Sequence, residues 1–392
     1  MQAQREMLAK ITRPDGRNIL IRKGLFRQID GLRMDRSLWV TGPAGSGKTT
    51  LVSSYIAYRN LPCLWYRIDE GDSDISSFFY YLGIAAKKAS PRSRRPLPLL
   101  TPEYAMETPA FARRYFEKLW GMFTRRASSD KDGGFVVVFD DYQDAASHSG
   151  LHSLICQGLS RITEGISVVL ISRSKPPPVF SRLYANNHMK VLGWDNLRLT
   201  RQETKEIVRA RGLKLKADEI ANIYDKTMGW AAGITLMLDN AHPNISENLS
   251  FRENAPAEVF DYFAAEIFER MKKQDQDFLI ATSVLPHMDA HMAAEQTGRT
   301  EAGRILASLN RNHFFTEKHP DKAPVYTYHP LFREFLLERM RESLGPREVN
   351  SLLDRAAAVL ERSGEVQYAV ALYRDSSNWE KPSPWCWAML KF

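Results

Sequence analysis

One short glycine-rich segment constrains this chain more than any other. The run Gly42-Pro-Ala-Gly-Ser-Gly-Lys-Thr49 follows a predicted strand and opens a predicted helix, which is the context that the pattern G-x-x-x-x-G-K-[ST] requires. Its glycines let successive backbone N–H groups point inward at phosphate oxygens, and the helix N-terminus adds partial positive charge. Lys48 is then expected to reach the β- and γ-phosphates of a nucleotide, and the Thr49 hydroxyl to bind Mg²⁺. The expected phosphate-binding residues are Gly42, Pro43, Ala44, Gly45, Ser46, Gly47, Lys48, Thr49 and Thr50.

Charged side chains follow two further predicted strands. The apolar run Phe135–Phe139 ends in Asp140 and Asp141, and the run Ile166–Ile171 leads to Arg173. Ligands of open α/β sheets gather at the carboxyl ends of the strands. We therefore expect Asp140 beside the magnesium ion, Asp141 orienting or deprotonating the attacking water, and Arg173 facing the γ-phosphate. Taken alone, the aspartate pair also fits a turn or a helix cap, and Arg173 also fits a surface position before a proline-rich loop.

The first half of the chain alternates between strand and helix patterns. Continuous apolar, β-branched runs suit the central strands of a parallel sheet that is covered on both faces. The alternation over residues 1–195 predicts an α/β fold with a doubly wound parallel sheet. The predicted elements are strands at Ser37–Thr41, Cys63–Ile68, Phe135–Phe139 and Ile166–Ile171, and helices at Leu51–Tyr58, Asp74–Lys88 and Pro109–Phe123.

Helical periodicity dominates after residue 195. Thr200-Arg-Gln-Glu203 is a capping box that opens a helix. A β-prone pair, His313–Thr316 and Val325–Tyr328, closes a group of helices and suggests a winged-helix layout. Two amphipathic helices follow and resemble one repeat of a helical solenoid. We expect four domains, namely a P-loop nucleotide-binding domain at 1–195, a small helical domain at 196–245, a winged-helix regulatory domain at 246–345, and the start of a helical-repeat region with an atypical tail at 346–392.

The composition narrows the class of protein. The 392 residues are 44% hydrophobic and 26% charged, which is ordinary for a globular protein. Apolar stretches fall short of the roughly 20 residues that span a bilayer, and the N-terminus lacks the apolar region of a secretory signal, so we expect a cytoplasmic protein without a membrane partner. Three scattered cysteines predict neither a disulfide framework nor a zinc site. The net charge of +8 permits an anionic partner such as nucleic acid but does not demand one.

Several strings along the chain occur in an order that is typical of one family. They are Thr41–Leu51, Trp65–Asp72, Val138–Tyr142, Leu170–Arg173, Gly229–Ala232 and Tyr328–Phe332. This series resembles the MalT-type regulators of the LuxR class, which are members of the signal-transduction ATPases with numerous domains (STAND). The first string is general to many nucleotide-binding proteins. The strings that contain Trp65, Asp140 and His329 are much more specific.

The resemblance implies an ATP- and ADP-binding domain, a small helical domain, a winged helix, a helical-repeat sensor and a C-terminal helix-turn-helix that binds DNA. ADP would hold a resting monomer, and ATP together with a small-molecule inducer or a regulatory protein would release it to self-associate. Gly229 would stand near the nucleotide, His329 would contact the β-phosphate of ADP, and Arg22 would line the adenine pocket. Because a strong glutamate base is not found after the aspartate pair, ATP hydrolysis is expected to be slow at most.

The chain also departs from the family pattern. The predicted solenoid stops after about one repeat, and no C-terminal helix-turn-helix is found in the 392 residues, so we do not expect DNA binding from this chain alone. We expect the switch module of a split or truncated regulator. Two alternatives remain open. One is a P-loop metabolic enzyme such as a small-molecule kinase, which would need an acceptor pocket. The other is a basic nucleic-acid-binding protein, whose affinity would fall steeply with salt.

Overall fold

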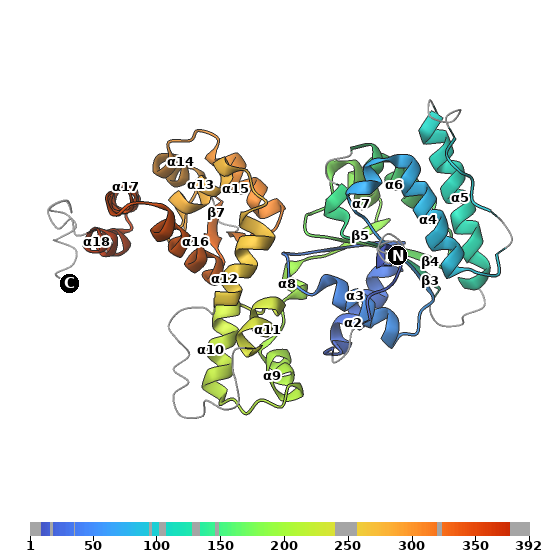
Figure 1. Cartoon of the computed structure of the whole chain (residues 1–392), viewed down its shortest axis with the longest axis horizontal. Coiled ribbons are helices and arrows are strands. Elements are labelled where there is room, and N and C mark those ends of the chain that lie inside the picture. The colour runs from blue at the N-terminus through green and yellow to red at the C-terminus, as the bar shows by residue number, and fades with distance from the viewer. Residues whose placement is uncertain are drawn as a thin grey trace. The chain divides into compact units, whose positions relative to one another are not determined.

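The chain forms two compact units in the computed structural model, Met1–Arg198 and Leu199–Phe392 (Figure 1). The first unit is built from strands and helices, and the second is mostly helical. The finer division of the second unit into three domains stays a prediction. The structure describes residues 9–15, 19–34, 36–93, 96–101, 107–127, 134–145, 149–239, 257–319 and 324–376.

A five-stranded parallel sheet forms the centre of the first unit. Its strand order is β2-β3-β4-β1-β5, so β4 lies between the strand that precedes the glycine-rich loop and the strand that precedes the aspartate pair. The register pairs Thr41 with Ser172 and Arg67 with Asp140. The carboxyl ends of these strands therefore meet at one edge. The strands are β1 (Ser37–Thr41), β2 (Cys63–Arg67), β3 (Phe135–Asp140), β4 (Ile166–Ser172) and β5 (Met189–Leu192).

Helices cover both faces of the sheet, which confirms the predicted doubly wound architecture (Figure 1). Successive side chains of a strand point to opposite faces. Val137 of β3 accordingly packs with α4, α5, α6 and α7, whereas Val136 packs with α2 and α3. The helices of this unit are α2 (Lys23–Arg33), α3 (Lys48–Tyr58), α4 (Ile75–Ala89), α5 (Thr108–Ala127), α6 (Ser149–Leu159), α7 (Ser181–Ala185) and α8 (Trp194–Leu197).

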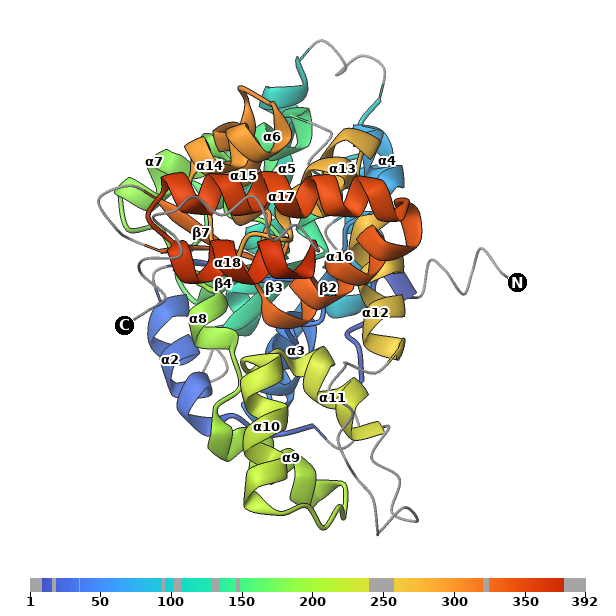
Figure 2. The same ribbon diagram turned by 90° about the vertical axis from the view of Figure 1, so that its left-hand side faces the viewer.

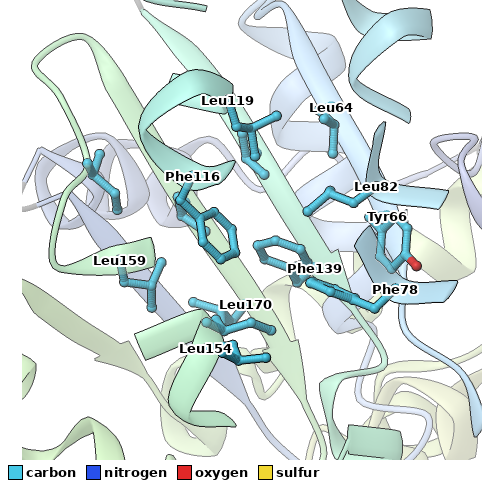
Figure 3. Packing of buried hydrophobic residues seen from close by; sticks show 14 of the residues in the cluster. Leu64, Tyr66, Phe78, Leu82, Phe116, Leu119, Phe139, Leu154, Leu159 and Leu170 are labelled. Carbon is cyan, nitrogen blue, oxygen red and sulfur yellow. The ribbon is translucent and has the colours of Figure 1, made fainter. Parts of the chain in front are cut away.

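Aromatic rings fill much of the larger core, which lies between the sheet and helices α4, α5 and α6. Figure 3 shows Phe78 and Phe116 pointing from the helices toward Phe139 of β3. Burial of such large rings removes much apolar surface from water and dominates the energetics of a core. This core holds β3 and β4 in place, and therefore also the loops that follow them.

The edge strand β5 is not predicted by the sequence patterns. It has four residues, two of them only half-buried, and pairs in parallel with β1. A strand this short, with Lys190 in its middle, carries little of the continuous apolar signal that marks the central strands.

An ion network attaches the first described segment to the sheet. Lys10 Nζ donates to Asp69 at 2.6 Å and to Asp72 at 2.9 Å, and the Tyr66 hydroxyl donates to Asp72 at 2.6 Å. Asp69 also caps the short 3₁₀ turn η1 (Glu70–Ser73). The acidic residues of the Trp65–Asp72 string thus stabilise local structure, with Lys10 as their counter-charge.

The second unit begins with the predicted capping box. The Thr200 side chain accepts from the Glu203 amide at 3.1 Å, and the Glu203 carboxylate accepts from the Thr200 amide at 2.8 Å. Later helices and a two-stranded hairpin give the predicted winged-helix layout. The elements are α9 (Arg201–Ala210), α10 (Ala217–Thr227), α11 (Ala231–Asp239), α12 (Ala257–Phe263), η5 (Ala264–Phe268), α13 (Lys273–Thr282), α14 (Ala290–Thr297), α15 (Ala302–Arg311), β6 (Thr316–His319), β7 (Val325–Tyr328) and α16 (Pro330–Ser343).

The prediction of a strand at His313–Thr316 is wrong. The strand is β6, which begins at Thr316 and pairs antiparallel with β7 from Tyr328. His313 and Phe315 have left-handed backbones, with φ of 51° and 47°, which an extended strand does not allow. The turn directs the Phe315 ring onto Trp230 at a centroid distance of 5.0 Å. Aromatic residues here serve packing within the unit instead of strand pairing.

Two consecutive helices follow the winged helix. They are α17 (Pro346–Arg362) and α18 (Val366–Asp375), and they lie side by side (Figure 2). The short connection between them makes the pair antiparallel, as expected for one helical repeat. The sequence also predicts a polar linker at residues 241–255 and places the atypical tail from residue 382 onward, and both segments lie outside the described residues.

Candidate nucleotide-binding site

The glycine-rich loop joins β1 to α3 through two left-handed glycines. Gly45 has φ of 67° and Gly47 has φ of 81°, a conformation that costs glycine little and other residues more. The helix begins immediately afterward, because Leu51 N donates to Gly47 O at 2.8 Å. The sequence-predicted residues from Gly42 to Ser46 line this turn, and Thr50 lies exposed on the first turn of α3. The loop therefore has the strand–turn–helix form that phosphate binding requires.

Gly42 leaves little space for a side chain. A Cβ atom there would lie 3.0 Å from Leu197 Cδ1, 3.1 Å from Ser46 Oγ and 3.5 Å from a ring atom of Trp194. The helix α8 thus packs directly against the first residue of the loop. A larger residue at this position would require the Leu197 and Ser46 side chains to shift by a few tenths of an ångström, independently of any ligand.

Lys48 is folded back into the loop. Its ammonium donates to Gly42 O and to Pro43 O, each at 2.8 Å. Burial lowers the pKa of Lys48 to about 7, the nearby Arg173 acts in the same direction, and Asp141 and Asp140 oppose the shift. A buried cation that is desolvated in this way gains from a nearby anion. The loop therefore has the electrostatics of an anion site.

Thr49 and Asp140 meet across the sheet edge. Thr49 Oγ1 donates to Asp140 Oδ1 at 3.0 Å, and the Asp141 amide donates to the same oxygen at 3.0 Å. Burial raises the pKa of Asp140 to about 6, and the adjacent Asp141 charge adds to the rise. A hydroxyl beside a carboxylate is the donor set that Mg²⁺ prefers, because the ion binds hard oxygen ligands. The residues present therefore fit a magnesium ion.

Asp141 is fixed by two partners. Its Oδ2 accepts from Arg67 Nε at 2.7 Å and its Oδ1 accepts from Gln143 Nε2 at 2.9 Å. The backbone of Asp141 is left-handed, with φ of 52°, a conformation that aspartate tolerates better than most residues. The turn brings its carboxylate beside Asp140 at the sheet edge, so both predicted carboxylates lie where β3 ends.

The loop that follows β4 is also held from two sides. Gln143 Oε1 accepts from the Arg173 amide at 3.0 Å. On the other side, the Ser174 carbonyl accepts from Trp39 Nε1 at 3.0 Å and from Thr41 Oγ1 at 2.9 Å. Arg173 is half-buried, and its charge acts on Lys48. The structure therefore brings Arg173 to the same edge as Lys48, Thr49 and the aspartate pair.

Arg22 lies at the start of α2, and its guanidinium has defined partners. It donates to Leu197 O at 2.8 Å and to Arg198 O at 2.9 Å. These bonds tie the end of α8 to the start of α2. The structure gives Arg22 a structural contact within the first unit, and its role toward a base stays a prediction.

The two predicted residues of the second unit lie close to each other. Gly229 has φ of 78°, and its carbonyl accepts from Leu199 N at 2.9 Å. His329 is 2% exposed, and its Nε2 lies 2.9 Å from the Thr227 carbonyl, which can only accept, so Nε2 carries the proton. Its ring packs edge-on against Trp230. His329 thus joins the winged helix to α10, and its predicted contact with ADP stays untested.

Sequence reasoning missed two residues at the sheet edge, Arg67 and Gln143. Both contact Asp141, yet neither belongs to a motif with a recognised spacing. Arg67 stands within the Trp65–Asp72 string, at the end of a predicted strand, and this position is a usable signal. Gln143 carries no such signal in the sequence, because its contact with the Arg173 amide depends on which strand lies beside β3.

Comparison with family models matches two parts of the chain. Residues 264–348 match the MalT winged helix domain, and residues 18–173 match the domain described as Nephrocystin 3, N-terminal. The first match covers the hairpin and the helices around it. The second covers the glycine-rich loop, the aspartate pair and Arg173.

Among curated proteins, the chain is similar to the HTH-type transcriptional regulator MalT of Yersinia enterocolitica. The two are 26% identical, over 84% of this chain and 36% of that protein. The MalT of Klebsiella pneumoniae is also 26% identical, over 86% of this chain and 37% of that protein. The resemblance to the MalT-type regulators is confirmed. The chain spans little more than a third of the length of these MalT relatives.

A solved structure agrees with this fold. The Walker-type ATPase of Pyrococcus abyssi matches 81% of this chain and 96% of its own chain, with 14% identity and a TM-score of 0.52. The likeness concerns the fold, a P-loop unit followed by helical elements. Of the helices within the described residues of this MalT-like chain, none combines the length and apolar character that crossing a membrane needs.

Proposed function

We propose that this chain is the nucleotide-binding switch module of a MalT-type regulator, and that it binds ATP and ADP together with Mg²⁺. The observation that carries the proposal is the loop from Gly42 to Thr49. Its buried ammonium, Lys48, has a pKa lowered to about 7 and gains from an anion. An adjacent hydroxyl and carboxylate complete the site at 3.0 Å.

Each side chain at the sheet edge has a part in this proposal. The loop amides and Lys48 bind the β- and γ-phosphates. Thr49 and Asp140 hold Mg²⁺, which when bound neutralises phosphate charge. Asp141 accepts a proton from the attacking water, and Arg173 faces the γ-phosphate. The Asp141 side chain is shorter than that of a glutamate base, and its carboxylate already accepts from two partners. We therefore expect hydrolysis to be slow, as suits a switch.

The regulatory part of the proposal is supported by the similarity to MalT and by the winged-helix match at residues 264–348. ADP would hold a resting form through His329 and Gly229, with Arg22 near the base, and ATP would favour self-association. An inducer or regulatory protein would act on this equilibrium through its different affinity for the two forms. Since the chain spans 36% of the length of its MalT relative, DNA binding is not part of this proposal.

Calorimetric titration tests nucleotide binding directly. Mg²⁺–ATP and ADP are titrated into the wild type, Lys48→Ala and the control Lys214→Ala, whose lysine is exposed in the second unit. We expect Lys48→Ala to weaken both nucleotides by about a hundredfold or more, because a charge-assisted contact in a buried site is lost, and Lys214→Ala to bind as the wild type does. Undiminished binding by Lys48→Ala would remove the site assignment.

Sedimentation velocity tests the switch. The wild-type protein is compared with ADP, with ATP and with a slowly hydrolysed ATP analogue. Larger species with ATP than with ADP are expected. An assembly state that is the same with both nucleotides contradicts the switch while leaving nucleotide binding intact.

A further inference from the structure

Gln143 links the two strand ends that carry the predicted catalytic groups. Its Nε2 lies 2.9 Å from Asp141 Oδ1, after β3, and its Oε1 lies 3.0 Å from the Arg173 amide, after β4. The strands are neighbours in the sheet, with Phe139 paired to Leu170. One half-buried side chain therefore connects both loops at the edge where the glycine-rich loop ends.

The orientation of this amide is determined by its partners. A backbone N–H can only donate, so the group facing Arg173 N is the oxygen. An ionised carboxylate can only accept, so the group facing Asp141 is the NH₂. The same two contacts cannot both form if the amide is turned over. Glutamine is thus matched to this position, because it offers one acceptor and one donor at the two ends of a short planar group.

Each of the two loops is also anchored on the side away from Gln143. Asp141 is held there by Arg67 at 2.7 Å. The Arg173 loop is held by Trp39 and Thr41, which donate to Ser174 O. The two sides are also joined by packing, since Trp39 contacts the Tyr142 ring of the loop after β3 at a centroid distance of 5.0 Å. The glutamine amide adds a direct polar link, because it bonds both to Asp141 and to the Arg173 amide.

We propose that Gln143 is a positioning residue that couples the Asp141 carboxylate to the Arg173 loop. The inference rests on the proposed function and names a further determinant of the same site. In the step concerned, a water oxygen forms a bond to the γ-phosphorus while the bond from that phosphorus to the bridging oxygen breaks. The water proton passes to Asp141, and the bond electrons leave with the β-phosphate of ADP. Gln143 touches neither the water nor the phosphates; it acts through Asp141 and Arg173.

Two substitutions distinguish the hydrogen bond to Asp141 from the hydrogen bond to the Arg173 amide. Gln143→Leu has a similar size and makes neither hydrogen bond. Gln143→Glu keeps an acceptor for the Arg173 amide but has no donor for Asp141, and its charge repels that carboxylate. Gln202→Leu is the matched control, since Gln202 is exposed on α9 of the second unit.

Three quantities are measured for each variant: the affinity for ADP, the affinity ratio of the analogue ATPγS to ADP, and the single-turnover rate of ATP hydrolysis. We expect Gln143→Leu to keep ADP affinity within about twofold, to change the affinity ratio, and to slow hydrolysis by about tenfold or more, because small misplacements of reacting groups cost this much. Gln143→Glu should keep the wild-type affinity ratio and still slow hydrolysis. Gln202→Leu should match the wild type in all three.

The outcomes distinguish this inference from the proposed function. Binding of ADP and ATPγS with an unchanged ratio and an unchanged hydrolysis rate in Gln143→Leu overturns the role of Gln143 and leaves nucleotide binding standing. The role of Gln143 is also overturned if ADP affinity falls in step with the other two quantities, since that result indicates a general structural loss. A wild-type protein that binds neither nucleotide overturns the proposed function itself.

Discussion

The Thr49 hydroxyl donates to Asp140 across the edge of the sheet at 3.0 Å, from the first turn of α3 to the end of β3. Thr49 follows the lysine of the glycine-rich loop, whereas Asp140 ends a strand that is not adjacent to β1. Their contact joins the predicted phosphate site to the predicted metal site. The contact also places the Asp140 carboxyl, whose pKa is about 6, between the two predicted sites.

Asp140→Asn is expected to stabilise the protein above pH 6 while removing Mg²⁺ binding. The folded-state pKa of about 6 lies above the ordinary value of 3.8 because of burial. The ionised form is therefore disfavoured by folding, and its cost appears as the pH rises from about 4 through 6. Asparagine avoids this cost and keeps an oxygen that accepts from Thr49 and from the Asp141 amide, so we expect a gain of about 1–2 kcal/mol at pH 8.

Scanning calorimetry at pH 5 and pH 8 checks the effect of Asp140→Asn. The control is Asp195→Asn, because that side chain is 97% exposed. The stabilisation should grow from pH 5 to pH 8 in Asp140→Asn and stay flat in the control. A variant that is less stable than the wild type at pH 8 contradicts the explanation by burial.

Nucleotide binding is expected to take up protons at alkaline pH through Lys48. The folded-state pKa of Lys48, about 7, lies below the ordinary 10.5 because of burial. Without a bound anion, burial of Lys48 therefore costs no stability above pH 10.5. The protein loses stability as the pH falls from 10.5 toward 7, and this loss stays constant below pH 7. At pH 8 the amine is mostly neutral, and bound phosphate favours the charged form. Uptake should therefore approach about one proton at pH 8 and be clearly smaller at pH 6.

Titration calorimetry in two buffers of different ionisation enthalpy measures this uptake. Lys48→Arg is the matched control, since guanidinium stays charged at both pH values and should show no Lys48-dependent uptake. Equal uptake at pH 6 and pH 8, or identical uptake in the arginine variant, contradicts the assignment of the proton to Lys48.

His329→Ala is expected to destabilise the second unit. The substitution removes the hydrogen bond from Nε2 to Thr227 O, leaves that carbonyl buried, and opens space beside Trp230. We expect a loss of about 2–3 kcal/mol, measured by urea unfolding. His329→Gln keeps a donor and should recover part of the loss.

The regulatory proposal adds a second expectation for His329. If the histidine also contacts ADP, His329→Gln should weaken ADP more than ATP in equilibrium titrations, even where most stability is retained. Equal losses of affinity for the two nucleotides would remove His329 from the switch. Its structural role, the contact with α10, would remain.

Two glycines of the same helix, α6, should respond oppositely to alanine. A Cβ on Gly158 would lie 2.7 Å from the Phe116 ring, which is itself stacked on Trp120, whereas a Cβ on Gly150 meets nothing within 4 Å. We expect Gly158→Ala to cost about 1–3 kcal/mol through overpacking and Gly150→Ala to be neutral or slightly stabilising. Thermal unfolding compares them, and equal effects would contradict the packing described for this face.

Local patterns predicted the parts of this molecule that depend on nearby residues. The loop from Gly42 to Thr49 and the capping box at Thr200 are each formed within a few residues, so their sequences suffice. The central strands were recognised because burial on both faces produces continuous apolar runs. The pairing of Asp140 with Thr49 followed from motif spacing together with the rule that carboxyl ends of parallel strands meet.

The remaining features depend on contacts between distant segments. Phe315 looks like a strand residue, yet it turns left-handed to pack on Trp230. His329 directly follows a predicted strand and carries no sign of burial in the sequence, yet its ring is buried and bonds to Thr227. Gln143 gains its contact with the Arg173 amide only because β4 lies beside β3. In each case the deciding neighbour is far away in sequence and carries no local signal.

The missing side chain of Gly42 has a mechanical consequence. It lets α8 rest on the turn that would hold the phosphates, and Arg22 pins the last carbonyls of that helix, at Leu197 and Arg198. The polypeptide leaves the first unit at this point. A shift of this turn when a nucleotide binds would therefore act directly on α8 and on the backbone that follows Arg198.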